Sequence, residues 1–593
     1  MLHITQGLQN NLRIPRHRML LSIYNYIFSR NAKHEEIGHR GYSTNNPPLS
    51  AEIADTFHPK LTTIFQQLDA IAPRFVLKQG DITILSAPDE FYTTLKDKIS
   101  QANKRIFLSS LYIGKTQKEL IACLDSALSK NKDLQVYILT DALRGTREAP
   151  ENICSASLIV PLVEKFGKHR IDVRMYHTPH LAGFSKSIAP KRFNEAYGLQ
   201  HMKLYGFDDE IILSGANLSN DYFTDRQDRY YKFTSKLLTN YYYDIHDAIA
   251  SISYQVLPST QLKQGFRLSW PTSNKSCEPH MNLQRFISDT SFLLDPLLKQ
   301  HKLSSFEEFN DTNDFDTIVY PVSQFTPLFP LQNDNSTEKP ALLRLLSFLD
   351  SPSIRWWFTA GYFNMLPQIQ DRLINGKALG SVITASPKAN SFYKSPGVSY
   401  YLPEAYLLFA KRFLEEVYRV GKSKLITVYE WQNGIVNTKG GWSYHAKGLW
   451  VTVPDEEEPS ITVIGSSNYT KRAYSHDLES NAIIITKDKR LKAQMKQEIN
   501  NLMKYALKLE LSDFQPKAKS EPVDASKAGA SLKPHVNISE NAMDAVEAVV
   551  TMDDNSDHER SDVKDNITKY EVDEDRKISY VVHLAVKLLG GKL

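Results

Sequence analysis

The sequence predicts an α/β protein built from two similar domains. The first observation is an internal duplication, because a His-x-Lys segment followed by a downstream asparagine occurs near residue 201 and again near residue 445. The second is that short β-rich runs alternate with helical patterns ahead of both copies. The third is size, since 593 residues that are 41% hydrophobic suffice for two to four domains of roughly 150 residues each.

The duplication extends over matched residues and matched spacings. The shared residues are His201, Lys203 and Asn217 in the first copy, and His445, Lys447 and Asn468 in the second. Histidine and asparagine are 16 positions apart in the first copy and 23 in the second, and the excess of seven equals a charged insert at 454–460. Eleven residues after each asparagine stands an acid, Asp228 or Glu479. Each copy therefore reads as a strand, a turn and a second strand, with a longer turn in the second copy.

The residues upstream of each motif give the rest of the domain. Strands are expected at 105–110, 136–140, 355–359 and 380–384, and helices at 115–128 and 402–420. These patterns predict a first α/β domain over 55–250 and a second over 340–510. The stretch between them, with polar runs at 310–314 and 332–336, is predicted to be a connector with a partly ordered insert over 251–339.

The repeated residue types suit phosphoryl chemistry. Side chains at i and i+2 of a strand share a face, so each histidine projects beside its lysine. If the copies pair about a pseudo-twofold axis, two imidazoles, two ammonium groups and two amides converge on one spot. One histidine could attack phosphorus while the other protonates the leaving oxygen, and the cations would stabilise the charge of the transition state. The lysines supply that charge, and no carboxylate–histidine ligand cluster is evident, so no metal or cofactor is predicted.

The pattern His-x-Lys-x4-Asp, followed by a Gly-[Ser/Ala]-x-Asn-like turn and present twice, resembles the phospholipase D superfamily. The resemblance implies two mixed sheets flanked by helices, related by a pseudo-twofold axis, with the active site between them. It implies these residues: catalytic His201, Lys203, Asp208, His445 and Lys447; phosphate-binding Asn217 and Asn468; and Asp228 and Glu479, which hold the histidines by hydrogen bonds. His201 is expected to be the nucleophile and His445 the general acid, although the two could be exchanged. The second copy departs from the pattern, because Thr452 stands where Asp208 stands in the first; in the superfamily this aspartate looks structural.

Longer strings, such as His201 to Glu210 and Ser214 to Tyr230, resemble the mitochondrial CDP-diacylglycerol–glycerol-3-phosphate 3-phosphatidyltransferases, also called phosphatidylglycerophosphate synthases. This family resemblance covers roughly 55–510. It implies the substrates CDP-diacylglycerol and glycerol 3-phosphate, a covalent phosphatidyl-histidine, and a place in phosphatidylglycerol and cardiolipin synthesis. It also implies peripheral contact with the mitochondrial inner membrane, on the matrix face, because no apolar run is long enough to span a bilayer.

The two ends of the chain differ from the middle. The first 34 residues contain no Asp or Glu and carry Arg and Lys among helically spaced apolar residues, which is typical of a mitochondrial transit peptide. The stretch 515–576 is acidic and poor in aromatics, as in a disordered linker. The last segment is amphipathic, so it could dock on the protein or lie on a membrane. The predicted boundaries outside the two domains are 1–42 for the transit peptide, 511–576 for the linker and 577–593 for the amphipathic segment.

Other functions are less consistent with the sequence. A hydrolase of the same superfamily, acting on phospholipid or nucleic acid, is the main alternative, and a catalytically inactive binding scaffold is a third. The net charge of +4 does not indicate a nucleic-acid partner. Ser109–Thr116 nearly matches a phosphate-binding loop, but Ser109 replaces the glycine that such a loop needs.

Overall fold

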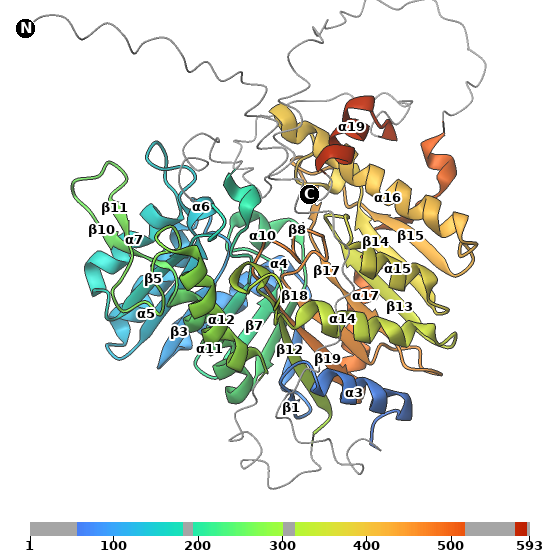
Figure 1. Cartoon of the computed structure of the whole chain (residues 1–593), viewed down its shortest axis with the longest axis horizontal. Helices are drawn as coiled ribbons and strands as arrows, with labels where there is room; N and C mark the ends of the chain where they lie inside the picture. Colours follow the sequence, from blue (N-terminus) through green and yellow to red (C-terminus); the bar gives the residue numbers. More distant parts are fainter. Residues whose placement is uncertain (1–55, 182–193, 300–314, 516–575, 590–593) are drawn as a thin grey trace, which may run out of the picture. The chain divides into compact units, whose positions relative to one another are not determined.

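The two copies form two nine-stranded mixed sheets with the same central strand order (Figure 1). The computed structural model describes residues 56–181, 194–299, 315–515 and 576–589. The first sheet runs β11 (Phe266–Ser269), β10 (Tyr254–Pro258), β5 (Ile171–Tyr176), β4 (Gln135–Asp141), β3 (Arg105–Ser109), β6 (Leu204–Phe207), β7 (Glu210–Ser214), β9 (Tyr230–Thr234) and β2 (Ile82–Leu85). The second runs β20 (Ala506–Lys508), β15 (Ile426–Trp431), β14 (Leu379–Ala385), β13 (Arg355–Ala360), β17 (Lys447–Val451), β18 (Ile461–Gly465), β19 (Glu479–Thr486), β12 (Thr317–Gln324) and β1 (Phe75–Leu77).

The strands from β5 to β2 in the first sheet have the same order and directions as the strands from β15 to β12 in the second. In the first sheet β5, β4 and β3 are parallel, and in the second β15, β14 and β13 are parallel; the next four strands in each sheet pair antiparallel. The predicted pair of similar α/β domains, each a mixed sheet flanked by helices, is therefore confirmed.

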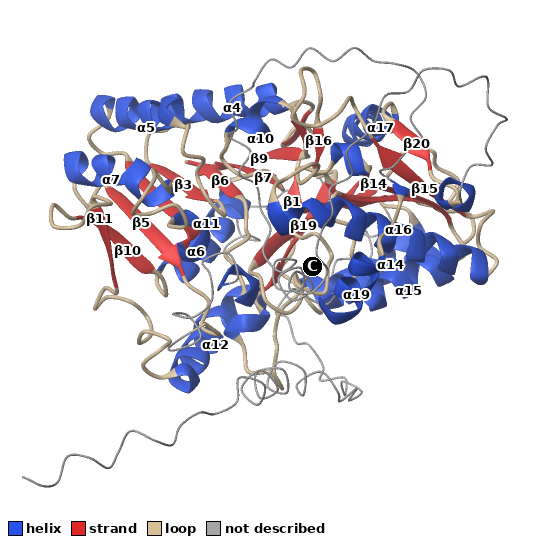
Figure 2. Ribbon diagram, turned by 90° about the horizontal axis from the view of Figure 1, so that it is seen from above, coloured by secondary structure: helices blue, strands red, loops and turns tan. Residues whose placement is uncertain are grey.

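Helices cover both faces of each sheet because the strands alternate their buried side chains. In β3, Ile106 and Leu108 pack with α4 and α5, whereas Phe107 packs with α11 on the other face (Figure 2). The helices of the first half are α4 (Pro88–Gln101), α5 (Lys118–Lys130), α6 (Ala142–Gly145), α7 (Ser155–Phe166), α10 (Asn220–Thr224), α11 (Lys236–Ala250) and α12 (Leu283–Lys299). Those on the second half are α3 (Thr62–Asp69), α14 (Glu338–Leu346), α15 (Pro367–Asn375), α16 (Leu402–Arg419), α17 (Lys489–Met503) and α19 (Tyr580–Leu589). The helix predicted at 402–420 is thus confirmed as α16.

One shared core joins the two halves. Buried side chains of α11, α12 and α17 and the facing strands of both sheets form a single cluster, which includes Ile211 of β7 and Ile464 of β18. Two short strands from different halves, β8 (Arg226–Gln227) and β16 (Ser443–Tyr444), also pair in parallel. Strand ends from both copies meet at this junction.

The region 251–339, predicted to be a connector, contributes to both sheets. It supplies β10 and β11 to the first sheet and β12 to the second, where β12 covers the edge of β19 and all eight of its residues are buried. Because polar runs lie on both sides of β12, the composition of this region did not predict the strand. Likewise α3 and β1, within the predicted first domain, pack on the second sheet.

The C-terminal helix α19 packs against α16. Its Val582, Ala585 and Val586 are buried. The predicted transit peptide, and the linker between 516 and 575, lie outside the described residues. None of the described helices has the length and apolar character needed to cross a membrane.

Candidate active site

Both His-x-Lys segments lie at the junction of the two sheets. His201 and Lys203 immediately precede β6, and His445 and Lys447 lie at the equivalent start of β17. All four side chains are buried. The structure therefore brings together the two histidines and two lysines that the sequence singled out.

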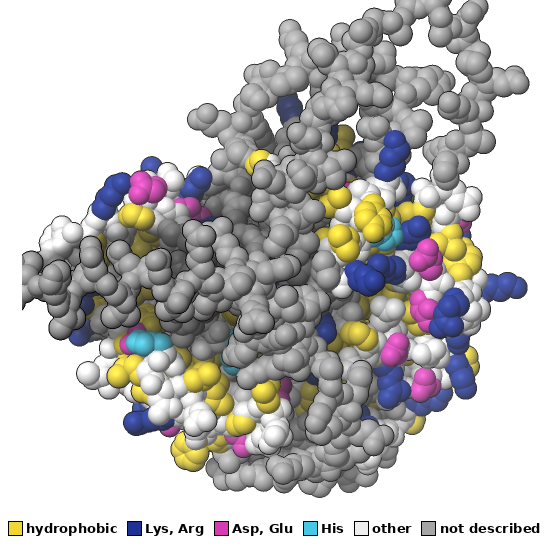
Figure 3. All heavy atoms as spheres, turned by 45° about the horizontal axis from the view of Figure 1, so that its top comes forward, with side chains coloured by type: hydrophobic (Ala, Val, Ile, Leu, Met, Phe, Trp, Pro, Cys, Tyr) yellow, Lys and Arg dark blue, Asp and Glu magenta, His cyan; other side chains and the backbone are white. Residues whose placement is uncertain are grey.

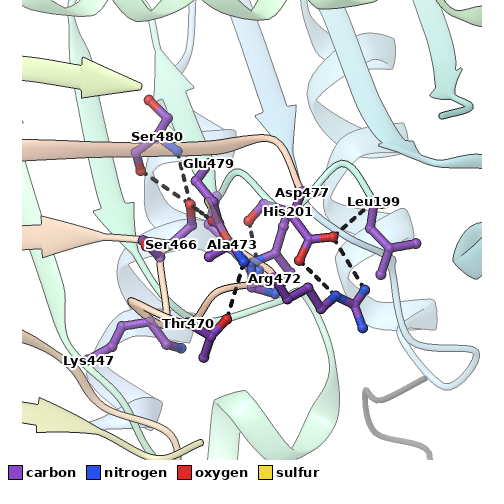
Figure 4. Close-up of polar contacts among 12 residues, drawn as sticks. Leu199, His201, Lys447, Ser466, Thr470, Arg472, Ala473, Asp477, Glu479 and Ser480 are labelled. Atoms are coloured by element: carbon purple, nitrogen blue, oxygen red, sulfur yellow. Dashed lines mark hydrogen bonds and ion pairs between the residues drawn. The ribbon is translucent and has the colours of Figure 1, made fainter. Parts of the chain in front are cut away.

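Each histidine is held by a carboxylate from the opposite half. The Nδ1 atom of His201 lies 2.9 Å from Oε1 of Glu479 (Figure 4), and Nδ1 of His445 lies 2.6 Å from Oδ2 of Asp228. An Nδ1–H that donates to a carboxylate fixes the tautomer, so Nε2 is left for chemistry. The sequence predicted the acids but not that they cross between the copies.

Short parallel backbone pairings cause this crossing. Gln200 bridges to Leu478, and the amide of His201 donates to the carbonyl of Leu478 over 2.9 Å. In the other half, the amide of His445 donates to the carbonyl of Gln227 over 2.8 Å. Since Leu478 precedes Glu479 and Gln227 precedes Asp228, each histidine is placed beside the acid of the other copy.

The two acids are fixed differently. Ser466 Oγ donates to Glu479 and accepts the amide of Ser480 over 3.1 Å (Figure 4). The position equivalent to Ser466 in the first copy is Gly215, where a Cβ atom would come within 2.6 Å of Lys447 Nζ and 2.7 Å of Asp228 Oδ1. Gly215 therefore leaves the space in which Lys447 approaches Asp228.

The electrostatics of the Asp228 pair follow from burial and from this approach. Complete burial raises the pKa of Asp228, and the Lys447 charge opposes that rise. Lys447 Nζ lies 2.7 Å from Nδ1 of His445, 3.3 Å from its Nε2 and 3.6 Å from Asp228 Oδ2, so the ammonium stands beside the imidazole–carboxylate pair. Lys203 is oriented differently, because its Nζ donates to the carbonyl of His201 over 2.8 Å. The pseudo-symmetry of the site is thus broken at the lysines.

Asn217 and Asn468 each have a buried side-chain oxygen without a hydrogen-bond partner among the described residues. The amide of Asn217 donates to the hydroxyl of Tyr222 over 3.2 Å. Rotating the terminal amide group of an asparagine by 180° exchanges its oxygen and nitrogen. Each of these side chains can therefore offer a substrate either a donor or an acceptor. An unpartnered buried polar atom is costly, which favours a ligand contact at both positions.

Two tyrosines beside His445 were missed by the sequence reasoning. The Tyr222 hydroxyl lies 3.4 Å from Nε2 of His445, and the Tyr362 ring meets the imidazole edge-on with centroids 5.4 Å apart. Aligning the copies at their asparagines would have revealed one signal, because the counterpart of Tyr222 is Ala473. Only one of the two histidines has a phenol at this position.

Asp208, which the sequence grouped with the catalytic residues, lies at the other end of β6 from His201 and bonds to the backbone there. It follows β6, seven residues from His201, which corresponds to roughly 23 Å along an extended chain. Its carboxylate accepts the backbone amides of Asn103, Lys104 and Arg105 and so holds the loop before β3. In the second copy Thr452 Oγ1 accepts the equivalent amide of Arg355 over 3.0 Å, which explains how the motif tolerates its departure there.

The segment that resembles a phosphate-binding loop uses its amides within the fold. Ile113 donates to Ser155 Oγ over 3.0 Å, and Gly114 donates to the Leu218 carbonyl over 2.8 Å. A phosphate-binding loop would direct such amides at its ligand. Across the described ranges, no group of three or more His, Cys, Asp or Glu side chains is arranged as metal ligands.

Comparison with known proteins gives the family. No family model matches the chain. The CDP-diacylglycerol–glycerol-3-phosphate 3-phosphatidyltransferase of Saccharomyces cerevisiae is 50% identical over 474 residues, which cover 79% of this chain and 90% of that protein. The chain belongs to this family. The Schizosaccharomyces pombe phosphatidyltransferase is 42% identical, over 73% of this chain and 90% of its own length, and the human one, named mitochondrial, is 31% identical over 74% and 80%.

A solved structure shows the same fold as this phosphatidyltransferase-family chain. The phosphatidylserine synthase of Haemophilus influenzae matches with a TM-score of 0.54 and 20% identity, over 76% of this chain and 92% of that one. At this identity the likeness supports the fold only, and the arrangement of the site rests on the contacts described above.

A buried acid behind Glu479 gives a prediction for stability. Burial, together with the charge of Glu479, raises the pKa of Glu338 from 4.5 to about 8. The folded protein therefore keeps this proton up to about pH 8, whereas the unfolded chain loses it near pH 4.5. Stability is thus lost as pH rises through that window, by about 1.4 kcal/mol per pH unit. Glu338→Gln, which cannot ionise, is expected to melt above the wild type at pH 8 and close to it at pH 4.5. Equal differences in melting temperature at the two pH values would contradict this expectation.

Proposed function

We propose that this chain transfers the phosphatidyl group of CDP-diacylglycerol to sn-glycerol 3-phosphate, the reaction for which its relatives are named. The products are phosphatidylglycerophosphate and CMP, and the first of these leads to phosphatidylglycerol and cardiolipin. The observation that carries the proposal is the pair of buried imidazoles, each oriented by a carboxylate from the opposite half.

In the first step, Nε2 of His201 attacks the phosphorus that bears the diacylglycerol. A P–N bond forms, the P–O bond to CMP breaks, and His445 gives its Nε2 proton to the departing oxygen. In the second step, His445 takes the proton of the primary hydroxyl of glycerol 3-phosphate. The hydroxyl oxygen attacks phosphorus, the P–N bond breaks, and both histidines return to their starting states.

The contact of Tyr222 supports this division of roles. The Tyr222 oxygen accepts from Asn217 and lies 3.4 Å from Nε2 of His445. A hydroxyl at this place can accept from Nε2 when it is protonated and donate to Nε2 when it is not, which suits a residue that passes a proton to and from oxygen. The equivalent position in the second copy, Ala473, places no phenol at His201.

An assay of purified protein tests the proposal. The protein is incubated with CDP-diacylglycerol in detergent micelles, with EDTA and labelled glycerol 3-phosphate. A transferase incorporates the label into lipid and releases one CMP for each label incorporated. Release of CMP together with phosphatidic acid, without use of glycerol 3-phosphate, would support the alternative of a hydrolase. Complete loss of activity in EDTA, restored by a divalent ion, would contradict the metal-independent mechanism.

The lysines and asparagines are proposed to bind the transferred phosphate. Replacing Lys447 with alanine removes a charge buried beside His445. We expect a loss of about 3 kcal/mol of transition-state stabilisation, or roughly a hundredfold in rate, and similar losses for Lys203, Asn217 and Asn468. The measurement is kcat at saturating substrate, with Lys104→Ala as a matched control on the surface. Near wild-type turnover in Lys447→Ala would show that the second copy does not contribute to catalysis.

The protein is proposed to act in the mitochondrion, on the matrix face of the inner membrane. The mitochondrial name of the human relative and the basic, acid-poor leader support this location. Removing residues 1–42 is expected to leave the protein in the cytosol when cells are fractionated. Alkaline carbonate is expected to release the full-length protein from mitochondrial membranes, since no helix that could span a membrane is found among the described residues. Retention after carbonate would indicate an integral anchor.

A further inference from the structure

We propose that α19 and the neighbouring Tyr400 form the surface through which the protein rests on an anionic lipid bilayer. The inference rests on the proposed function, which requires a substrate with two acyl chains. The lipid-facing surface is defined by Tyr580, Val581 and Leu584 of α19 and by Tyr400 of the short helix η7 (Gly397–Tyr401).

The first observation is that α19 is apolar on two sides. One side, with Val582, Ala585 and Val586, is buried against α16. The other side exposes Tyr580 by 81%, Val581 by 41% and Leu584 by 40%. A helix that only docks on a protein turns polar residues outward, so packing alone does not account for the exposed side.

The second observation is charge. The described segment 576–589 contains Arg576, Lys577 and Lys587 and no acidic residue. Among the described residues, Glu430 pairs with Arg576 over 2.8 Å and Glu404 accepts the amide of Ser579. Figure 3 shows hydrophobic side chains beside Lys and Arg side chains on the part of the molecule that holds α19. Exposed tyrosines and aliphatic residues flanked by lysines suit the interface of an anionic bilayer.

The third observation is the position of this surface relative to the site. The buried side of α19 shares one apolar cluster with Tyr362, Phe392 and Tyr406. Tyr362 in turn contacts His445 edge-on. One continuous apolar cluster therefore connects α19 to the tyrosine that contacts a reacting histidine. A lipid whose head group reaches that histidine would keep its acyl chains near α19.

Tyr400 extends the surface beyond α19. It is 56% exposed, and its ring stands 5.6 Å from that of Tyr401, which packs against the same cluster. The exposed residues thus come from two segments far apart in sequence, as expected of a surface formed by the fold.

Vesicle sedimentation of the full-length protein tests the surface. The vesicles contain phosphatidylcholine with or without phosphatidylglycerol. The variant carries Tyr580→Ser, Val581→Ser and Leu584→Ser, and the matched control carries Phe292→Ser, Leu331→Ser and Leu507→Ser, whose side chains are at least as exposed but lie elsewhere. We expect roughly 100-fold weaker binding for the variant and wild-type binding for the control. Lys577→Gln and Lys587→Gln should each weaken binding roughly fivefold, and only when phosphatidylglycerol is present.

A second readout separates this proposal from the proposed function. A short-chain CDP-diacylglycerol dissolved without a bilayer reports the chemistry alone. We expect the triple variant to lose activity on vesicles relative to activity on the short-chain substrate. If the wild type fails on the short-chain substrate, the proposed function is wrong. If the triple variant binds vesicles like the wild type, or if light scattering shows a dimer that the triple variant dissociates, the lipid-facing surface is wrong.

Discussion

The His201→Gln variant is expected to release no CMP from CDP-diacylglycerol, whereas His445→Gln is expected to release about one CMP per protein and then stop. The first substitution removes the nitrogen that attacks phosphorus, so neither step can occur. The second substitution removes a proton donor, on which the first step depends only weakly. The departing phosphate of CMP has a second pKa near 6, so it is a good leaving group even when it is not protonated. The second step depends on His445 more strongly, because an alcohol is a poor nucleophile until a base removes its proton.

The measurement is CMP release within a single turnover, combined with mass spectrometry of the trapped protein. A phosphatidyl adduct on His201 should accumulate in His445→Gln, and steady-state turnover should fall by about 10²–10⁴-fold. His280→Gln, at an exposed histidine, serves as the matched control. An adduct mapped to His445 in His201→Gln would exchange the two roles. Absence of an adduct on either histidine, with turnover retained, would rule out the two-step mechanism.

The sequence contained enough information for the fold and for the central residues of the site. A motif that occurs twice at matched spacing is improbable by chance, so the spacing alone was sufficient to group His201, Lys203, His445 and Lys447. The alternation of strands and helices then gave two similar sheets. What the sequence could not provide is the contact between the copies. Spacing along one chain does not reveal which strand ends meet across a pseudo-twofold axis.

Three cases illustrate that limit. Asp208 belongs to the motif yet lies at the far end of β6, because strand direction separates residues that are close in sequence. Lys203 and Lys447 occupy equivalent positions yet point differently. Gly215 leaves room for Lys447 beside Asp228, whereas Ser466, at the equivalent position of the other copy, donates to Glu479. Tyr222 sits on a one-turn helix that no periodicity predicts, and its relation to His445 depends on packing between the halves.

The crossed pairing of acids and histidines leads to a second large effect. Asp228→Asn is expected to impair the step that depends on His445, and Glu479→Gln the step that depends on His201, although each acid belongs to the other copy of the repeat. An amide in place of the carboxylate no longer requires Nδ1 to carry the proton, so the imidazole can adopt the tautomer in which Nε2 is protonated. Such a nitrogen cannot attack phosphorus, and an imidazolium at this position loses its counter-charge.

We therefore expect Glu479→Gln to abolish the single-turnover release of CMP, as His201→Gln does, and Asp228→Asn to allow that release but to block transfer to glycerol 3-phosphate. Each should lower steady-state turnover by about 10²–10⁴-fold. Asp208→Asn is the matched control, because its carboxylate accepts backbone amides away from the site. It should lower the melting temperature, reflecting about 1–3 kcal/mol for a lost acceptor, while both steps keep their relative rates. If Asp228→Asn blocked CMP release and Glu479→Gln spared it, each acid would serve the histidine of its own copy, and the crossed arrangement would not be the one that acts in catalysis.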